Sequence, residues 1–241
     1  MNLFPVLYVM CFVAQFAFVP LFLKYYWPVK CKTSLMYKMI CASLYLIAAV
    51  SCMKAADNFS PFAKYMLTAL IVGWFGDLFL HIISEKKVYF AIGFLSFMTG
   101  HVFFVLAFLN VQKNMFPTAP VFAAGEIIAI VLIFAGFAAY AVITKMKLGV
   151  IGIAIGVYAV VISSMFVKGV SLCTRLFISG STLTAWSLAT VGIGAILFVM
   201  SDATLAEMLF GSHKSRLLRI FNITTYFAGQ MLLASSILVL S

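Results

Sequence analysis

The chain consists of long, uninterrupted runs of apolar residues that are separated by short polar connections. Each run is about 20 residues long, which is the length a helix needs to cross the hydrocarbon core of a bilayer. A membrane barrel would instead alternate polar and apolar residues over short strands. The pattern therefore predicts eight transmembrane helices, over Leu3–Leu23, Ser34–Met53, Phe62–Ile83, Val88–Asn110, Pro120–Ile143, Leu148–Val167, Thr182–Phe210 and Ile220–Leu240.

The composition excludes a water-soluble or disordered protein. Hydrophobic residues occupy 65% of the 241 positions, charged residues only 9%, and the mean hydropathy is +1.17. Soluble domains are about half apolar and a quarter charged. The connections are too short for a further domain, so we predict an all-α, polytopic integral membrane protein with a single transmembrane domain over residues 1–241.

The charge distribution predicts an orientation in the membrane. The net charge is +10, but the basic residues lie between or near the ends of the apolar runs, where they mark topology and face lipid headgroups, so no nucleic-acid partner is expected. Eleven of the 16 lysines and arginines belong to the first, third, fifth and seventh connections, with Lys38 counted in the first. The positive-inside rule then places both termini outside. The absence of a sorting signal favours a bacterial plasma membrane.

Two pairs of runs resemble each other and suggest an internal repeat. Four helices separate the pairs, so both copies would have the same orientation and form two parallel four-helix halves. Chance similarity between apolar sequences is the alternative. The matching positions are Gly76, Asp77 and Leu80 with Ser201, Asp202 and Leu205, followed by Gly100-His101 and Gly229-Gln230.

Asp77 and Asp202 are the strongest candidates for catalysis. A carboxylate inside a membrane helix costs about 2.5–3.5 kcal/mol, so such residues usually face a polar cavity and have a function. On the predicted topology both lie in the inner half of the bilayer. We expect no lysine or arginine within a helix to neutralise them, so a close pair would share one proton. One protonated and one ionised carboxyl group suit general acid–base chemistry. The alternative is that one aspartate only joins or caps helices.

A few other polar residues lie near the same depth. His101 could orient a carboxylate, relay a proton or bind phosphate, or could simply hydrogen-bond a neighbouring helix. Tyr226 and Gln230 lie one turn apart on one face of the last helix, and Tyr158 is a weaker candidate. His81 follows Asp77 by four residues, so it would lie at the rim of the cavity.

Other charged residues have simpler explanations. Glu126 begins the fifth helix near its outer end, where an acid complements the helix amino terminus, and we leave it out of the site. Lys214, Arg216 and Arg219 could attract lipid phosphate, although membrane topology alone also explains them.

Known metal and nucleophile motifs are absent. The chain has no His-Glu-x-x-His or paired-cysteine spacing for zinc, no Gly-x-Ser-x-Gly and no glycine-rich phosphate loop. His213 falls in a connection, which disfavours a site with three histidines. We therefore predict no metal and no cofactor, with a mixed site of His81, His101, Asp77 and Asp202 as the alternative.

Four segments together resemble the YhhN-like family of membrane proteins, whose characterised members are lysoplasmalogenases. Their order and spacing on the third, fourth, seventh and eighth helices match the family pattern. These segments are GDLFL at Gly76–Leu80, FMTGHVFFVLAF at Phe97–Phe108, ILFVMSDATLA at Ile196–Ala206 and TTYFAGQMLLASSI at Thr224–Ile237.

The resemblance implies hydrolysis of the sn-1 vinyl ether bond of a lysoplasmalogen to a fatty aldehyde and glycerophosphoethanolamine or glycerophosphocholine. The family's two acidic positions fall on Asp77 and Asp202. One would protonate the β-carbon, and the other would stabilise the oxocarbenium ion and activate water, by analogy with glycosidases. Which aspartate does which stays open. His101, Tyr226, Gln230 and His81 would hold the water or the headgroup.

Two other functions fit the same residues. Paired intramembrane acids and a parallel repeat also suit a small proton-coupled transporter. A non-catalytic lipid-binding or scaffold protein would tolerate Asp→Asn at both positions. In each case the expected partners are lipids, and for the enzyme a lysophospholipid substrate.

Overall fold

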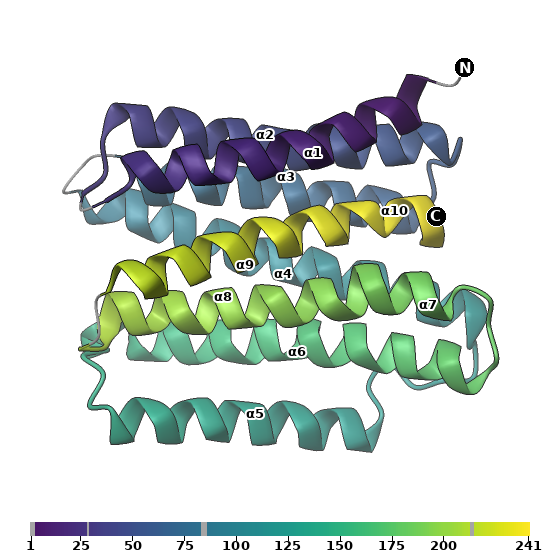
Figure 1. Ribbon diagram of the computed structural model, residues 1–241. Helices are drawn as coiled ribbons and strands as arrows, with labels where there is room; N and C mark the ends of the chain where they lie inside the picture. The colour runs from purple at the N-terminus through teal and green to yellow at the C-terminus, as the bar shows by residue number, and fades with distance from the viewer. Residues whose placement is uncertain (1–2, 28, 83–85, 213–214) are drawn as a thin grey trace.

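A computed structural model describes residues 3–27, 29–82, 86–212 and 215–241. Within these ranges the chain forms eight helical spans that run side by side (Figure 1), each long and apolar enough to cross a membrane, and no strand. The predicted all-α class is confirmed. The spans are α1 (Leu3–Tyr25), α2 (Lys32–Ala55), α3 (Pro61–His81), α4 (Lys87–Met115), α5 (Ala124–Ile143), η1 (Gly149–Ile151) with α6 (Gly152–Ile178), α7 (Thr184–Ser187) with η2 (Leu188–Gly192) and α8 (Ile193–Phe210), and α9 (Arg216–Ser235) with α10 (Ile237–Leu240).

Local sequence explains where several helices begin. The Ser60 hydroxyl accepts a hydrogen bond from the Ala63 amide at 3.1 Å, and Pro61 follows at the first helical position, where no N–H is needed. The Ser215 hydroxyl likewise accepts from the Leu218 amide at 3.1 Å. The seventh span contains a π-helical turn at η2.

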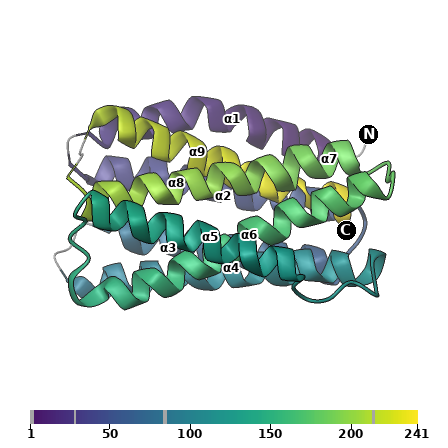
Figure 2. The ribbon, with the colours of Figure 1, turned by 90° about the horizontal axis from the view of Figure 1, so that it is seen from below.

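The last span lies at the centre of the bundle and the fifth at its edge. α9 packs against α1, α2, α3 and α8, whereas α5 packs mainly against α6 (Figures 1 and 2). Within the most apolar 18-residue stretch of each span, 72% of the last span is buried inside the protein, compared with only 11% of α5. α5 is therefore the span with the largest share of its surface available to lipid.

The sixth helix is longer than predicted. The prediction ended it at Val167 and counted Lys168 with the next connection, but α6 continues to Ile178. Lys168 is only 1% exposed; its Nζ donates to Gln112 Oε1 at 2.6 Å and lies 3.0 Å from Glu126 Oε2. A lysine that is buried and paired in this way does not end a span.

α4 also continues five residues past its predicted end, to Met115. The other predicted helix ends lie within about four residues of the observed ones, and the predicted end at Ile83 falls outside the described residues.

Both helix pairs of the suggested repeat pack closely at their glycines. A Cβ atom on Gly100 of α4 would lie 3.2 Å from Ala69 O of α3, and one on Gly229 of α9 would lie 3.0 Å from Gly194 O of α8. Glycine thus lets the two backbones approach in each pair. The division into two parallel four-helix halves stays a prediction.

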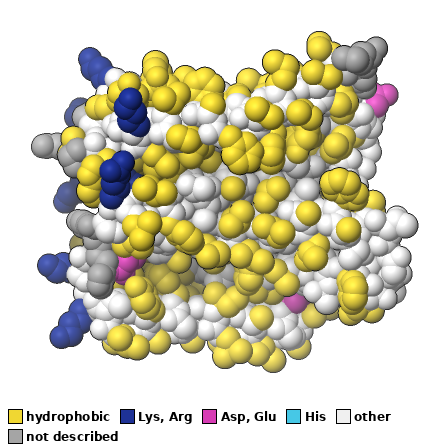
Figure 3. Space-filling view, in the orientation of Figure 1, with side chains coloured by type: hydrophobic (Ala, Val, Ile, Leu, Met, Phe, Trp, Pro, Cys, Tyr) yellow, Lys and Arg dark blue, Asp and Glu magenta, His cyan; other side chains and the backbone are white. Residues whose placement is uncertain are grey.

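The surface divides into an apolar belt and a basic end. Figure 3 shows hydrophobic side chains over the middle of this face, and lysine and arginine side chains gathered at its left end. That end carries the α1–α2 connection and the start of α9 (Figure 1). The chain is a multi-pass membrane protein, and the side of the membrane that each end faces stays a prediction.

Candidate active site

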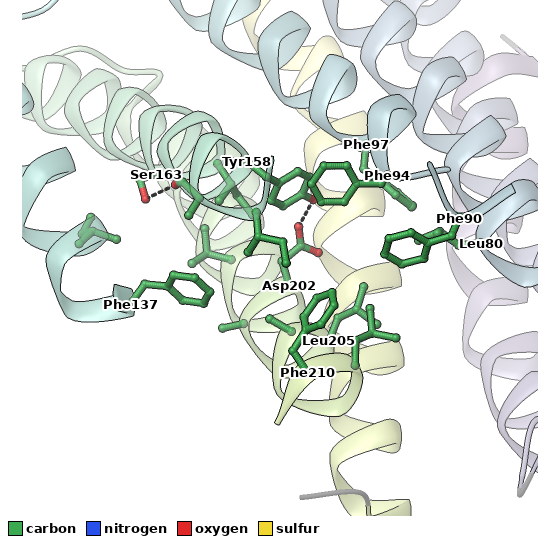
Figure 4. A pocket seen from close by; sticks show the side chains of 18 residues that line it. Leu80, Phe90, Phe94, Phe97, Phe137, Tyr158, Ser163, Asp202, Leu205 and Phe210 are labelled. Carbon is green, nitrogen blue, oxygen red and sulfur yellow. Dashed lines mark hydrogen bonds between the residues drawn. The ribbon is translucent and has the colours of Figure 1, made fainter. Parts of the chain in front are cut away.

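An apolar cavity lies between α4, α5, α6 and α8 (Figure 4). It is open to its surroundings, and its empty space of about 800 Å³ includes the open mouth. Phenylalanines of α4 and α5 form much of its wall, and among the described lining residues Asp202 is the one charged side chain, with Tyr158 and Ser163 as the other polar ones. The predicted residue Asp202 therefore faces space that suits a hydrocarbon chain.

Two donors hold one oxygen of Asp202. The Tyr158 hydroxyl on α6 donates to Asp202 Oδ2, and His101 Nε2 on α4 lies 3.4 Å from the same oxygen. His101 Nε2 is also 3.0 Å from the Tyr158 oxygen, so a proton on Nε2 serves both contacts. The Asp202 side chain is 13% exposed, and its second oxygen faces the cavity (Figure 4).

His101 is held by aromatic rings. It is 1% exposed, and its ring centroid lies 4.8 Å from that of Phe198 in an edge-to-face arrangement. Its Nδ1 atom has no hydrogen-bond partner within the described parts of the chain. The structure thus brings the predicted pair His101 and Asp202 together, and adds Tyr158, the weaker candidate.

Asp77 lies in a second polar cluster, between α2, α3 and α9. It is 1% exposed and accepts hydrogen bonds at Oδ2 from the Tyr226 hydroxyl at 2.7 Å and the Tyr45 hydroxyl at 3.2 Å. Its Oδ1 lies 3.0 Å from Lys38 Nζ, an ion pair that is the one polar contact of this oxygen among the described residues.

The expectation that no cation would neutralise the acids was wrong for Asp77. Lys38 falls within the predicted run Ser34–Met53 but was counted with the first connection; in the structure it lies inside α2 and is 9% exposed. Ser34, Lys38 and Tyr45 share one buried face of α2. A polar stripe at helical spacing was the signal in the sequence that could have revealed this partner.

Gln230 completes the cluster around Asp77. Its Nε2 donates to the Tyr226 oxygen at 3.1 Å, while its Oε1 is buried and has no partner among the described residues. Gly73 leaves room here, since a Cβ on it would lie 3.2 Å from Gln230 Nε2. The predicted pair Tyr226 and Gln230 therefore belongs to Asp77.

His81 lies apart from the cavity. Its Nε2 is 2.8 Å from the Ser34 hydroxyl, and its ring centroid is 4.7 Å from that of Tyr26. It is 1% exposed at the last residue of α3. Its neighbour Leu80, not His81, lines the cavity of Asp202.

Aromatic rings separate the two clusters. The Tyr226 ring centroid lies 5.4 Å from that of Phe198 and 5.9 Å from that of Phe97, and Phe97 also lines the cavity. In the described structure no hydrogen bond joins Asp77 to Asp202, so the two carboxyl groups share no proton by direct contact.

No three histidine, cysteine or acidic side chains gather among the described residues, and the mixed site of His81, His101, Asp77 and Asp202 is not assembled. His213 and Lys214 lie outside those residues.

Residues 33–237 match the sequence profile of the YhhN family. The chain belongs to the YhhN family. This YhhN-family chain is 29% identical over 178 residues to a Bos taurus protein and 30% identical over 178 residues to a Homo sapiens protein, both named Lysoplasmalogenase TMEM86A. Each comparison covers 73% of this chain and 66% of the relative, so the chain spans slightly less than two thirds of their length. No solved structure is detectably similar.

Proposed function

We propose that this YhhN-family protein hydrolyses the sn-1 vinyl ether bond of lysoplasmalogens. The observation that carries the proposal is a carboxyl group, Asp202, set in the wall of an open apolar cavity and held by Tyr158 and His101. A single-chain lipid can enter such a cavity from the membrane and present its polar end to the acid. The names of the bovine and human relatives support the same reaction.

The first step is protonation of carbon by Asp202. Tyr158 occupies Oδ2, so the other oxygen is available to carry a proton into the cavity. Among the residues that the structure describes, no lysine or arginine forms an ion pair with Asp202, and we assign the proton of the first step to this side chain. Transfer of this proton to the β-carbon of the vinyl ether produces an oxocarbenium ion, with the positive charge shared between the α-carbon and the ether oxygen.

The second step is addition of water, with the Asp202 carboxylate left by the first step as the base. The negative charge of this carboxylate also stabilises the adjacent cation. Water adds to the α-carbon, Asp202 takes its proton, and a hemiacetal results. Asp77 is buried outside the cavity lining, beyond Phe97 and Tyr226, so it acts on this site only through the side chains packed against the cavity wall.

Collapse of the hemiacetal returns Asp202 to its starting state. Asp202 gives its proton to the glycerol oxygen, the bond from the α-carbon to that oxygen breaks, and the hemiacetal hydroxyl gives its proton to the Asp202 carboxylate. The products are a fatty aldehyde and the glycerophospho-headgroup alcohol, with one water consumed. Asp202 thus ends protonated, as it began, and these steps use only water and the chain's own carboxyl group.

The purified protein in mild detergent tests this function. We expect free aldehyde, measured by mass spectrometry, from lysoplasmenylethanolamine and none from the saturated 1-O-alkyl analogue. Only the vinyl ether has a carbon–carbon double bond whose β-carbon can be protonated. A chelator should leave the rate unchanged. A proton-coupled carrier would release no aldehyde in detergent and would move solute only across a sealed bilayer. Absence of aldehyde from a monodisperse preparation would reject the hydrolase.

A further inference from the structure

Two basic residues that are far apart in the sequence meet at the end of α3. Lys30, in the α1–α2 connection, donates through Nζ to the Leu80 carbonyl at 2.5 Å. Arg219, in the first turns of α9, donates to the Tyr26 carbonyl at 2.7 Å, and its guanidinium lies 4.3 Å from the centre of the Tyr26 ring. Since the Tyr26 ring packs 4.7 Å from that of His81, both cations border the same helix end.

The two cations, with Lys38, also act on each other electrostatically. Lys30 as a whole is exposed, but its ammonium group is partly desolvated, and this lowers its pKa. The positive charges of Lys38 and Arg219 lower the pKa further by a smaller amount. Lys38 lies deeper and is paired with Asp77. Like charges held close together favour a bound anion, which relieves their repulsion.

Leu80 connects this basic group to the cavity. Its side chain lines the cavity that contains Asp202, and its carbonyl accepts the hydrogen bond from Lys30. An ion near Lys30 would thus lie just beyond the cavity wall. In a lysophospholipid, the three carbons of glycerol separate the phosphate from the sn-1 oxygen, so one molecule can place its chain in the cavity and its phosphate outside it.

We infer that Lys30 and Arg219 bind the phosphodiester group of a lysophospholipid. This assignment rests on the proposed function, because it places the headgroup of the same substrate. Arginine and lysine both form charge-assisted hydrogen bonds to phosphate oxygens. The Tyr26 and Trp27 rings, which lie 4.3 and 4.9 Å from the Arg219 guanidinium, hold that side chain in position.

Stabilisation of helix ends is the competing explanation. Lys30 binds a carbonyl in the last turn of α3, and Arg219 binds one just past the end of α1, where cations are favourable in any protein. The two explanations differ in one measurable property: only a phosphate site makes lipid affinity depend on the phosphate.

Binding without turnover tests the site. Calorimetric titration in detergent would compare a saturated 1-O-alkyl-glycerophosphoethanolamine, which cannot be hydrolysed as a vinyl ether, with the 1-O-alkylglycerol that lacks phosphate. We expect Lys30→Gln to weaken binding of the phosphate-bearing lipid about tenfold and to leave the alkylglycerol unchanged. Lys32→Gln, an exposed neighbour, is the matched control and should change neither. Arg219→Lys retains the charge if Arg219→Gln fails to fold.

The outcomes separate the possible ligands. Displacement of the phosphate-bearing lipid by inorganic phosphate would show that free phosphate also occupies the site; its failure, with the Lys30 effect intact, would assign the site to the lipid headgroup. Equal affinity of wild type for the two lipids, or equal losses in Lys30→Gln, would overturn the inference and leave the cations as helix-end contacts. A phosphate preference without any aldehyde production would keep this site and reject the hydrolase.

Discussion

Asp202 and Asp77 carry the same side chain in different surroundings. Asp202 meets a tyrosine, a histidine and an apolar cavity, whereas Asp77 is buried against a lysine and two tyrosines. Such differences let identical groups serve different roles. Membrane energetics identified both residues from the sequence. Their separate partners could not be predicted, because they depend on which faces of distant helices meet.

Tyr158→Phe removes a hydrogen bond to Asp202 without changing the shape of the cavity. We expect kcat to fall about ten- to a hundredfold, since a hydrogen bond to a charged group contributes about 1.5–3 kcal/mol. KM should change little. The measurement is the initial rate of aldehyde release as a function of substrate concentration. Tyr89→Phe, whose ring stacks on Phe79 away from the cavity lining, is the control; equal rates for the two variants would contradict the role of Tyr158.

Lys38→Met leaves Asp77 buried without its cation. We expect the free energy of unfolding in detergent to fall by about 3 kcal/mol, because an unpaired buried charge is costly. Adding Asp77→Asn should recover part of that loss, since the two changes are coupled. Lys32→Met serves as the exposed control. Additive losses in a thermal or denaturant titration would show that the pair has no energetic coupling.

At the scale of elements, the sequence predicted the number and order of the helices but not every end. Apolar runs of bilayer length identify spans directly. Lys168 misled the prediction for α6, since a lone lysine in a sequence resembles a connection until its partner Glu126, on another helix, is known. The site residues on α8 and α9 were predicted from their depth, whereas Lys38 and Tyr45 were missed because they lie on a helix without an acid.

Lys168→Met breaks the buried contact that ties α5 to α6. We expect a loss of about 3 kcal/mol in the free energy of unfolding, because Glu126 then stays buried with less compensation. The rate per folded molecule should persist, since this network lies outside the cavity. Lys64→Met, at an exposed position of α3, is the control. An unfolding curve equal to wild type would mean that the network adds no stability.

Ala206→Phe places a large side chain in the cavity, one helical turn from Asp202. We expect KM for long-chain lysoplasmalogens to rise about tenfold, and KM for short-chain ones to change less, because the ring takes space that the chain would fill. The measurement is KM over a series of chain lengths. Ala135→Phe, on the exposed side of α5 and outside the cavity lining, should leave the series unchanged. A uniform change at all lengths would show that the chain lies elsewhere.

The whole molecule is a bundle in which burial rises from α5 at the edge to α9 at the centre. Composition alone predicted this class, since 65% hydrophobic content leaves no stable form in water. The membrane also explains the position of the site, because an apolar substrate can reach an open cavity directly from lipid. The excess of basic residues at one set of connections favours an orientation with both termini outward, which stays a prediction.

The most direct test of the proposed chemistry compares aldehyde release by wild type, Asp202→Asn and Asp57→Asn from lysoplasmenylethanolamine in detergent. Asp57 is exposed in a turn with φ of 48°, a conformation that asparagine adopts readily, so this control makes the same chemical change away from the site. We predict wild-type rates for Asp57→Asn and a loss of about 10²–10⁴-fold for a folded Asp202→Asn, since an amide cannot supply the proton. Aldehyde release by Asp202→Asn at the wild-type rate would contradict the assignment of Asp202 as the acid.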